Sequence, residues 1–198
     1  ITIPKNVVTM GTGIHTVFEG CTNLTTVTFA EGMVKIPDDA CRKCTSLTNV
    51  TIPDSVASIG ASAFSDCTSL TDVNIPDSVT YIGNWAFRNC TGLTNIVLPS
   101  ALNEIGSGAF ENCIGLKTIT IPMSVRIIDF RAFYGCTNLE DIVFLNQNNN
   151  VALNKSKITL NVGEKEYLIP KLGVEHSISI VDGSHDGVTI PEQTIIKA

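Results

Sequence analysis

The feature that most constrains this chain is a series of cysteines spaced 23 residues apart. Six of its seven cysteines belong to the series: Cys21, Cys44, Cys67, Cys90, Cys113 and Cys136. Three residues before each of them stands a second series: Phe18, Cys41, Phe64, Phe87, Phe110 and Phe133. The seventh cysteine therefore takes the place of a phenylalanine. Because a fixed period of about 20 to 50 residues is the signature of a repeat architecture, the chain is predicted to be a stack of similar coils.

The first half of each repeat has the pattern of a short strand. In one repeat Leu47, Val50 and Ile52 are separated by threonine and asparagine side chains. Alternation with a period of two, together with β-branched residues, is typical of a half-buried strand. The strand is expected to end at Pro53, since proline has no amide hydrogen to donate to a sheet.

The second half of the repeat has a different spacing. Val56, Ile59 and Ala63 are three and four residues apart, which predicts a single helical or 3₁₀ turn. Several repeats place a glycine after the isoleucine, where a positive φ or a close neighbour would favour a residue without Cβ; these are Gly60, Gly83 and Gly106. One such coil is too small to fold alone, so the coils must stack, with their strands in one continuous parallel sheet. The predicted fold is an α/β repeat solenoid with short helical turns.

The repeat unit C-x-x-L-x-x-V-x-I-P-x-S-V-x-x-I-G-x-x-A-F is almost unbroken from Cys44, Cys67, Cys90 and Cys113. It resembles the BspA-like, or treponemal-type, leucine-rich repeats of many bacterial surface proteins. The resemblance implies a right-handed, curved coil with its parallel sheet on the concave side, exposed outside the cell and often used for adhesion. More familiar leucine-rich repeats carry Asn or Cys in the turn after the strand, where this chain has Ser55, Ser78 and Ser124.

We predict three segments. Residues 1–145 form the solenoid, and the polar run at 146–150 forms a linker. Residues 151–198 alternate in hydrophobicity and are predicted to be a small all-β segment of about four strands. This segment resembles the opening of a bacterial Ig-like domain, and a cap on the solenoid is the alternative. In the last coil Ile127, Phe130 and Tyr134 fall on one face, which we expect the tail to cover.

Charge and hydropathy disfavour nucleic acid as a partner and a membrane-spanning helix within this sequence. The net charge is −6, so no broad basic surface is available for nucleic acid. No apolar run approaches the roughly 18 residues of a transmembrane helix. The first residues lack the pattern of a signal peptide, and the sequence starts within a repeat. We expect the targeting signal and anchor to lie outside this sequence.

Cysteine and histidine chemistry is also disfavoured. The Cys41–Cys44 C-x-x-C could be a redox pair or half a zinc site, but both cysteines occupy repeat positions that predict core packing. The cysteine series could form disulfides, although equivalent side chains in stacked coils point the same way, which favours free thiols. The histidines, His15, His176 and His185, form no recognisable triad, and the loop at 182–186 is read as a turn rather than a calcium site. We predict no catalytic residue, metal or cofactor.

Two candidate binding surfaces remain. The first, called here the Thr/Asn face, consists of the outward residues of the strands: Thr26, Thr28, Asn49, Thr51, Asp72, Asn74, Asn95, Thr118, Thr120 and Asp141. The alternative is a solvated face without a ligand. The second is Tyr81 and Trp85, four residues apart on the predicted helical turn at positions that vary between repeats. Exposed aromatic residues are enriched at interfaces, although incidental surface aromatics are the alternative.

These features predict a non-catalytic, secreted or cell-surface module that binds a protein or a glycan, host extracellular matrix included. The alternative is a structural stalk or spacer that displays other domains and has no ligand of its own. An enzyme is disfavoured because no nucleophile and base occur together in a known motif.

Overall fold

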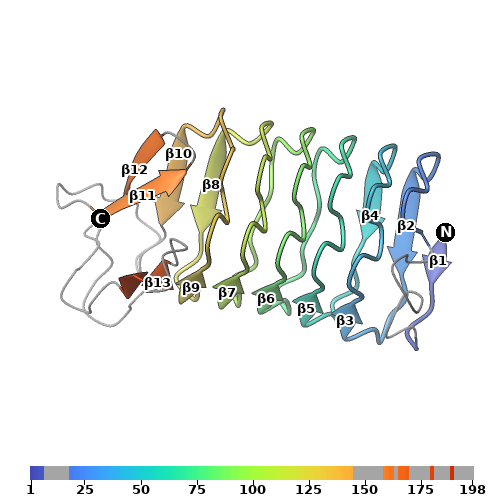
Figure 1. Ribbon diagram of the computed structural model, residues 1–198. Coiled ribbons are helices and arrows are strands. Elements are labelled where there is room, and N and C mark those ends of the chain that lie inside the picture. Colours follow the sequence, from blue (N-terminus) through green and yellow to red (C-terminus); the bar gives the residue numbers. More distant parts are fainter. Residues whose placement is uncertain (7–17, 145–157, 163–164, 170–178, 181–187, 190–198) are drawn as a thin grey trace.

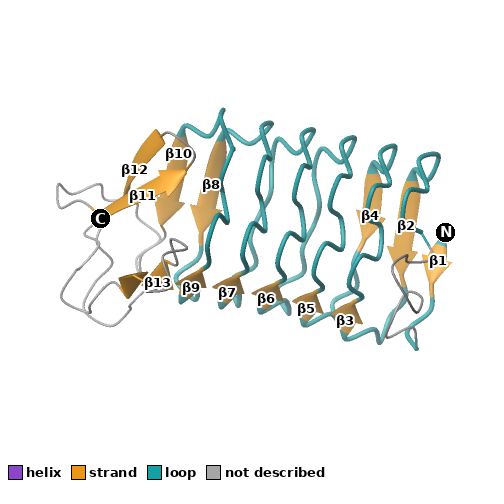
Figure 2. Cartoon of the chain, viewed as in Figure 1, coloured by secondary structure: helices purple, strands orange, loops and turns teal. Residues whose placement is uncertain are grey.

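A computed structural model describes residues 1–6, 18–144, 158–162, 165–169, 179–180 and 188–189. The coils lie side by side in one row, along which the chain advances from its N-terminal to its C-terminal end (Figure 1). The described residues form strands and turns and contain no helix (Figure 2). The linker predicted at 146–150, the loop at 182–186 and the three histidines lie outside the described residues.

The first ladder of parallel strands lies where the sequence predicts strands. It joins β1 (Thr2–Ile3), β2 (Thr26–Phe29) and β4 (Asn49–Thr51), and further along it joins β8 (Thr118–Ile121) to β10 (Asp141–Phe144). Between these two parts, the described residues form a single isolated parallel bridge, from Asn74 to Val97. Partners such as Val27 and Val50 are one repeat apart. Strands lie at the predicted positions in the coils of β2, β4, β8 and β10, whereas the continuous sheet expected here is interrupted.

The second ladder is continuous, and it replaces the predicted helical turn. It joins β3 (Lys35–Ile36), β5 (Ser58–Ile59), β6 (Tyr81–Ile82), β7 (Glu104–Ile105) and β9 (Ile127–Ile128), all parallel. The Thr80 N–H donates to Ala57 O and the Gly83 N–H to Ile59 O, each at 2.9 Å. These amides bond the preceding coil instead of a carbonyl four residues back, so no helix forms. The helical prediction is therefore wrong here.

The third side of each coil is a chain of tight turns. The Ser65 N–H donates to Ser62 O at 3.1 Å, within the coil, whereas the Phe64 N–H donates to Ala86 O at 2.8 Å, in the next coil. Two residues per coil have positive φ, at 54° for Ser62 and 62° for Asp66. A left-handed residue interrupts any helical path. The backbone groups are satisfied across the coils, as a buried backbone requires.

Described strands of the tail lie beyond the last coil. β13 (Ser179–Ile180) pairs in parallel with β9 and in antiparallel with β14 (Val188–Thr189). β11 (Ile158–Val162) and β12 (Lys165–Ile169) form an antiparallel hairpin. The tail thus extends the second ladder at the coil that contains Ile127. The Ig-like resemblance of residues 151–198 stays a prediction.

The core consists of side chains stacked from coil to coil. The ring centroids of Phe64, Phe87, Phe110 and Phe133 follow one another at 5.3, 5.4 and 5.5 Å, with nearly parallel rings. Cys41, which takes the place of a phenylalanine, is fully buried. Phe29, where the next four coils have Ile or Leu, contacts the Phe64 ring edge-on at 6.2 Å between ring centroids. The larger residue at this position compensates for the smaller Cys41.

The glycine after each isoleucine is explained by a close neighbour, not by its φ angle. Gly83 has no positive φ, and a Cβ on it would lie 2.7 Å from the Gly60 carbonyl carbon and 2.8 Å from Ile59 O. Neighbouring coils meet here backbone to backbone. Of the two reasons given by the sequence, close approach is the correct one.

The serines after the strand hold adjacent coils together. Ser55 Oγ accepts the Gly32 N–H at 2.9 Å and donates to Met33 O at 2.8 Å, and Ser78 Oγ donates to Val56 O at 2.6 Å. Serine therefore bridges neighbouring backbones at the turn. Ser124 Oγ is buried but has no hydrogen-bond partner within the described part of the chain.

These serines provide a matched test of the bridging role. We expect Ser78→Ala to lower the free energy of unfolding by about 1 to 2 kcal/mol, because it leaves the Val56 carbonyl without its donor. Ser124→Ala should be neutral or slightly stabilising, since it removes a buried hydroxyl that has no partner. Urea unfolding of both variants measures the difference. Equal destabilisation by the two substitutions would contradict this account.

Candidate functional site

The Thr/Asn face is exposed as the sequence predicts. Seven of its side chains are exposed, namely Thr26, Asn49, Thr51, Asp72, Asn74, Asn95 and Thr118, while Thr28 and Thr120 are half-buried. Thr26 lies opposite Asn49, and Thr28 opposite Thr51, so the side chains of successive coils form rows. Asp141 pairs with Thr118 through its backbone in β10. The structure thus brings these residues together on one side of the solenoid.

The border of this face consists of threonines that link the coils. The Thr48 hydroxyl donates to Thr25 O at 3.2 Å, and the Thr94 hydroxyl donates to Thr71 O at 3.4 Å. The carboxylates of the Thr/Asn face belong to Asp72 and Asp141. Such a surface can exchange hydrogen bonds with hydroxyl and amide groups, but it has no grouped acids and bases for proton transfer.

Tyr81 and Trp85 do not form the helical pair that the sequence predicts. Tyr81 is half-buried in β6, opposite Ser58 and Glu104, whereas Trp85 lies in the turn that follows. Within the described residues no ring contact joins them. Burial raises the pKa of Tyr81, and the nearby carboxylate of Glu104 adds to the shift. The phenol therefore stays neutral at physiological pH.

Trp85 is an unusual residue at its backbone position. Its φ is 55° and its side chain is 44% exposed. A bulky residue in the left-handed region is uncommon and costs about 1 to 3 kcal/mol. The same position in other coils is also left-handed and is occupied by Asp39, Ser62, Gly108 and Arg131. The fold therefore imposes the conformation, and nothing in the packing of the coil requires tryptophan.

A cation–aromatic cluster lies on the last coil. The Arg131 guanidinium is 4.9 Å from the centroid of Phe130 and 4.8 Å from that of Tyr134. Tyr134 is 44% exposed. The sequence pattern singled out the two aromatic residues but not the arginine. Arg131 lies between Phe130 and Tyr134 in the sequence, and a basic residue between two aromatic residues could have indicated a cation–π contact.

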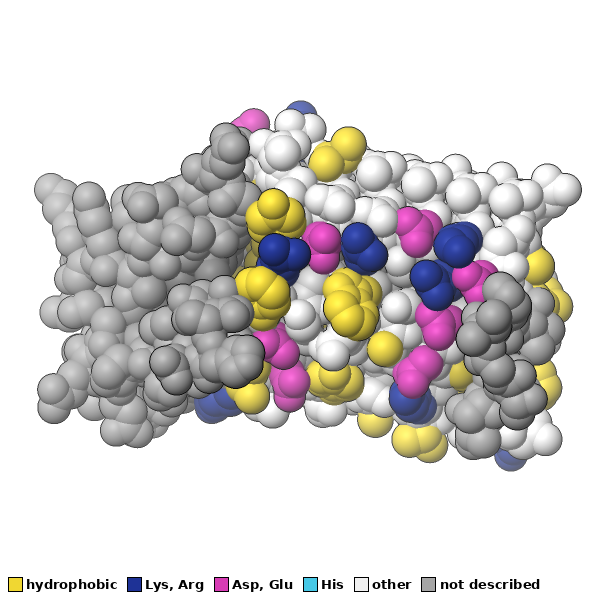
Figure 3. Space-filling model, in the orientation of Figure 1, with side chains coloured by type: hydrophobic (Ala, Val, Ile, Leu, Met, Phe, Trp, Pro, Cys, Tyr) yellow, Lys and Arg dark blue, Asp and Glu magenta, His cyan; other side chains and the backbone are white. Residues whose placement is uncertain are grey.

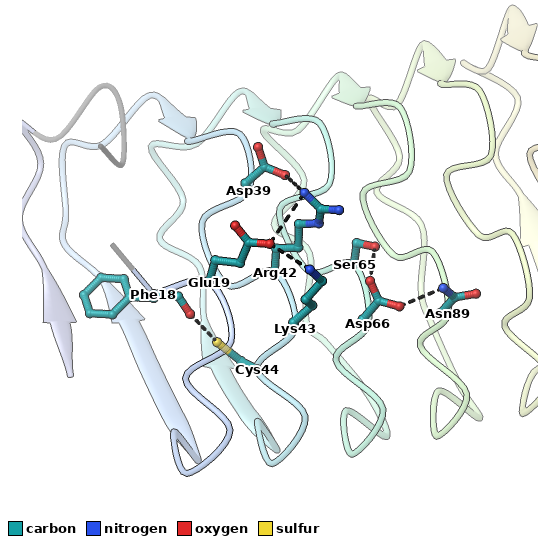
Figure 4. A network of polar contacts seen from close by, with 9 residues as sticks. All are labelled: Phe18, Glu19, Asp39, Arg42, Lys43, Cys44, Ser65, Asp66 and Asn89. Atoms are coloured by element: carbon teal, nitrogen blue, oxygen red, sulfur yellow. Dashed lines mark hydrogen bonds and ion pairs between the residues drawn. The ribbon is translucent and has the colours of Figure 1, made fainter. Parts of the chain in front are cut away.

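A network of charged and amide side chains crosses the third side of the N-terminal coils (Figure 4). Lys43 Nζ donates to Glu19 Oε1 at 3.0 Å, and the Arg42 guanidinium lies 3.7 Å from the same oxygen. Asp66 Oδ1 accepts the Asn89 amide at 2.7 Å. Sequence reasoning missed these contacts because the partners lie in different coils. Most of the charged side chains on this side are paired with a neighbouring coil, which indicates a structural role.

The cysteine series is part of the core. All seven thiols are free, and six are buried. Each buried thiol of the ladder donates to a backbone carbonyl of the preceding coil, as Cys90 Sγ does to Phe64 O at 3.1 Å. Burial raises the pKa of Cys90 and Cys113, and it raises that of Cys136 to about 12. These thiols are protonated and inaccessible at neutral pH.

The C-x-x-C motif is buried as well. A hydrogen bond between the two side chains raises the pKa of Cys41 and lowers that of Cys44. Neither residue is exposed, so both pack in the core as their repeat positions predict. In the described part of the chain, no three His, Cys, Asp or Glu residues are placed to hold a metal ion.

The buried thiols predict that the protein loses stability in alkali. Below about pH 8.5, the pKa of an unfolded cysteine, both states keep their protons and stability is complete. Above it the unfolded state ionises while the folded state does not, so each thiol with a raised pKa, such as Cys90, Cys113 and Cys136, lowers the free energy of unfolding by about 1.4 kcal/mol per pH unit. The decrease continues until the folded pKa is reached, about 12 for Cys136.

Urea unfolding midpoints between pH 7 and 10.5 measure this effect. The Cys113→Ala variant is the control, because it removes one titrating thiol and should show a shallower dependence on pH. A midpoint that does not change up to pH 10.5 would show that the thiols are not protected.

Comparison with known proteins agrees with this geometry. The model of the BspA type leucine rich repeat region matches the chain in six copies, over residues 1–107 and 57–160. A Treponema pallidum leucine-rich-repeat protein of known structure is 31% identical with a TM-score of 0.62, and the match covers 72% of this chain and 62% of that one. A Eubacterium ventriosum leucine-rich-repeat protein is 30% identical with a TM-score of 0.55, over 65% of this chain and 34% of that one.

A Bacteroides ovatus leucine-rich-repeat protein shares the fold. It is 23% identical with a TM-score of 0.55, and the match covers 93% of this chain and 60% of that one. The chain thus spans about six tenths of the length of the T. pallidum and B. ovatus proteins. No curated protein matches the sequence. The described residues contain no helix that is long and apolar enough to cross a membrane.

Proposed function

The chain belongs to the BspA-type leucine-rich-repeat family, and from this premise we propose that it is a non-catalytic recognition module, secreted or held at the cell surface, which binds a protein or a glycan. The family is generally associated with interactions at surfaces and is generally non-catalytic. Host extracellular matrix is one source of such ligands. The net charge of −6 disfavours nucleic acid as a partner.

The observation that carries the proposal is the exposure of the Thr/Asn face. Most apolar residues of the described coils are used in the core, and most charged residues of the third side are used in contacts between coils. Other side chains are exposed and contribute little to the core or to the contacts between coils; these are Asn49, Thr51, Asn74 and Asn95. A flat polar face on a rigid support can bind a large ligand at a low entropic cost.

A stalk or spacer is the second candidate. It is supported by the same regular stacking of coils, whose hydrogen bonds between neighbours give a stiff rod. A spacer needs no ligand of its own. The two candidates therefore differ in whether the isolated chain retains anything from outside the cell.

Surface plasmon resonance against purified extracellular-matrix proteins and an immobilised glycan array tests the proposal. We expect at least one ligand to bind the wild-type chain. Asn74→Arg should weaken that binding at least tenfold, because a long cation is placed in the middle of the Thr/Asn face. Asn103→Arg is the matched control, since Asn103 is exposed on another side of the coil. It should bind within about twofold of the wild type.

Either of two results would contradict the proposal. If no matrix protein or glycan is retained, the chain is better described as a spacer. If Asn74→Arg and Asn103→Arg bind equally well, the Thr/Asn face is not the binding surface.

A further inference from the structure

Trp85 is held in a fixed position by the coil that follows it. A Cβ on Gly108 would lie 2.6 Å from Trp85 Cδ1 and 2.8 Å from its Nε1. The same point is 2.9 Å from Glu111 Oε2. The indole edge therefore rests against the Gly108 backbone, with the Glu111 carboxylate on the other side. Glycine is the one residue type at position 108 that leaves room for this ring.

The surroundings of the ring are polar. Glu111 is largely buried and lies 3.6 Å from the Arg88 guanidinium, whose side chain is 44% exposed. Asn84 Oδ1 accepts the Ser107 N–H at 2.9 Å, and among the described residues the amide NH₂ of Asn84 has no partner. The carboxylate of Glu111 near the exposed ring is thus oriented by Arg88, and Asn84, the residue before Trp85, has an amide NH₂ available.

The ring also stands alone. The other exposed large hydrophobic residues of the described part are Ile1, Val34, Val97, Ile114 and Tyr134, and none is in the turn that contains Trp85. Figure 3 shows a face on which hydrophobic side chains stand mostly singly among charged and polar ones. A protein interface usually centres on a cluster of apolar residues from which water is excluded. The turn that contains Trp85 has no such cluster among the described residues.

A single aromatic ring with a polar border fits a sugar better than a protein. A pyranose ring whose hydroxyl groups and glycosidic bonds are equatorial, as in β-linked glucose-type polymers, has C–H bonds on its flat faces and hydroxyl groups at its edge. The C–H face can stack on the indole, while the hydroxyls reach Arg88, Glu111 and Asn84. The chain has a net charge of −6, which disfavours sulfated or uronic acid polymers.

We propose that Trp85, supported by Gly108, is a stacking site for a ring of a neutral, β-linked glycan. The proposal rests on the proposed function, because it assumes a ligand outside the cell, and it names the ligand class at a second surface. Trp85 acts as a binding residue, and Gly108 as a positioning residue that keeps the indole in place.

The chain has a single tryptophan, so tryptophan emission, excited selectively over that of the three tyrosines, reports on Trp85 alone. We expect titration with cellohexaose or chitohexaose to shift or quench the emission in a saturable way. On a surface bearing the same hexaose, Trp85→Asn should lose at least tenfold in affinity without loss of melting temperature, because asparagine suits the left-handed backbone. Trp85→Tyr should retain part of the binding.

Gly108→Ala tests the support under the ring. It should displace the indole and weaken hexaose binding several-fold while the tryptophan is still present. Gly20→Ala is the matched control, because Gly20 also has a positive φ, of 72°, but has nothing within 4 Å of its Cβ position. Both variants carry the same backbone cost, so a difference in binding is due to the displaced ring.

The result that overturns the inference is a fluorescence signal unaffected by both hexaoses, or binding that Trp85→Asn leaves unchanged. Loss of binding to a protein rather than to a hexaose on Trp85→Asn would also overturn it. Asn74→Arg keeps the two proposals distinct. If Asn74→Arg abolishes ligand retention while Trp85→Asn does not, the proposed function stands and the stacking site is wrong.

Discussion

Hydrogen bonds between neighbouring coils are the interaction on which the rest of this structure depends. The 23-residue coil is too short to close a core or to satisfy its own backbone. Its amides therefore bond the coils on either side, as Gly83 bonds Ile59 and Phe64 bonds Ala86. Once the backbone is paired in this way, a helical turn has no donors left for its own carbonyls. The strands of the second ladder and the left-handed turns of the third side are both consequences.

The same stacking determines which side chains can occupy each position. Residues at the same repeat position contact each other in adjacent coils. Phenylalanines therefore stack on phenylalanines, and each buried thiol of the ladder bonds a carbonyl of the preceding coil. Where the residue at one repeat position differs in size from its equivalents in other coils, a neighbouring residue has to differ in size as well. Phe29 does so for Cys41 in the core. Gly108 does so for Trp85 at the surface, where it leaves the space into which the indole fits.

We therefore look for function at residues whose identity is not explained by the packing between coils. The Thr/Asn face has side chains that the core does not use, and Trp85 occupies a backbone conformation that suits smaller residues better. Charged residues such as Arg42 and Lys43 are also at the surface, but they bond across coils to the largely buried Glu19 and are accounted for by the fold. This distinction separates the two proposed binding surfaces from the rest of the exposed area.

The 23-residue period was enough to predict the repeat, the family, most core positions and a strand where β4 (Asn49–Thr51) lies, because periodicity records which side chains face inward. The same period predicted that Cys41 and Cys44 lie in the core rather than in a redox site. The second ladder, the polar network of Glu19 and the support of Trp85 by Gly108 could not be predicted from the period, because each of them depends on a contact between coils. The spacing of Val56, Ile59 and Ala63 fits a helical turn equally well until the backbone partners in adjacent coils are known.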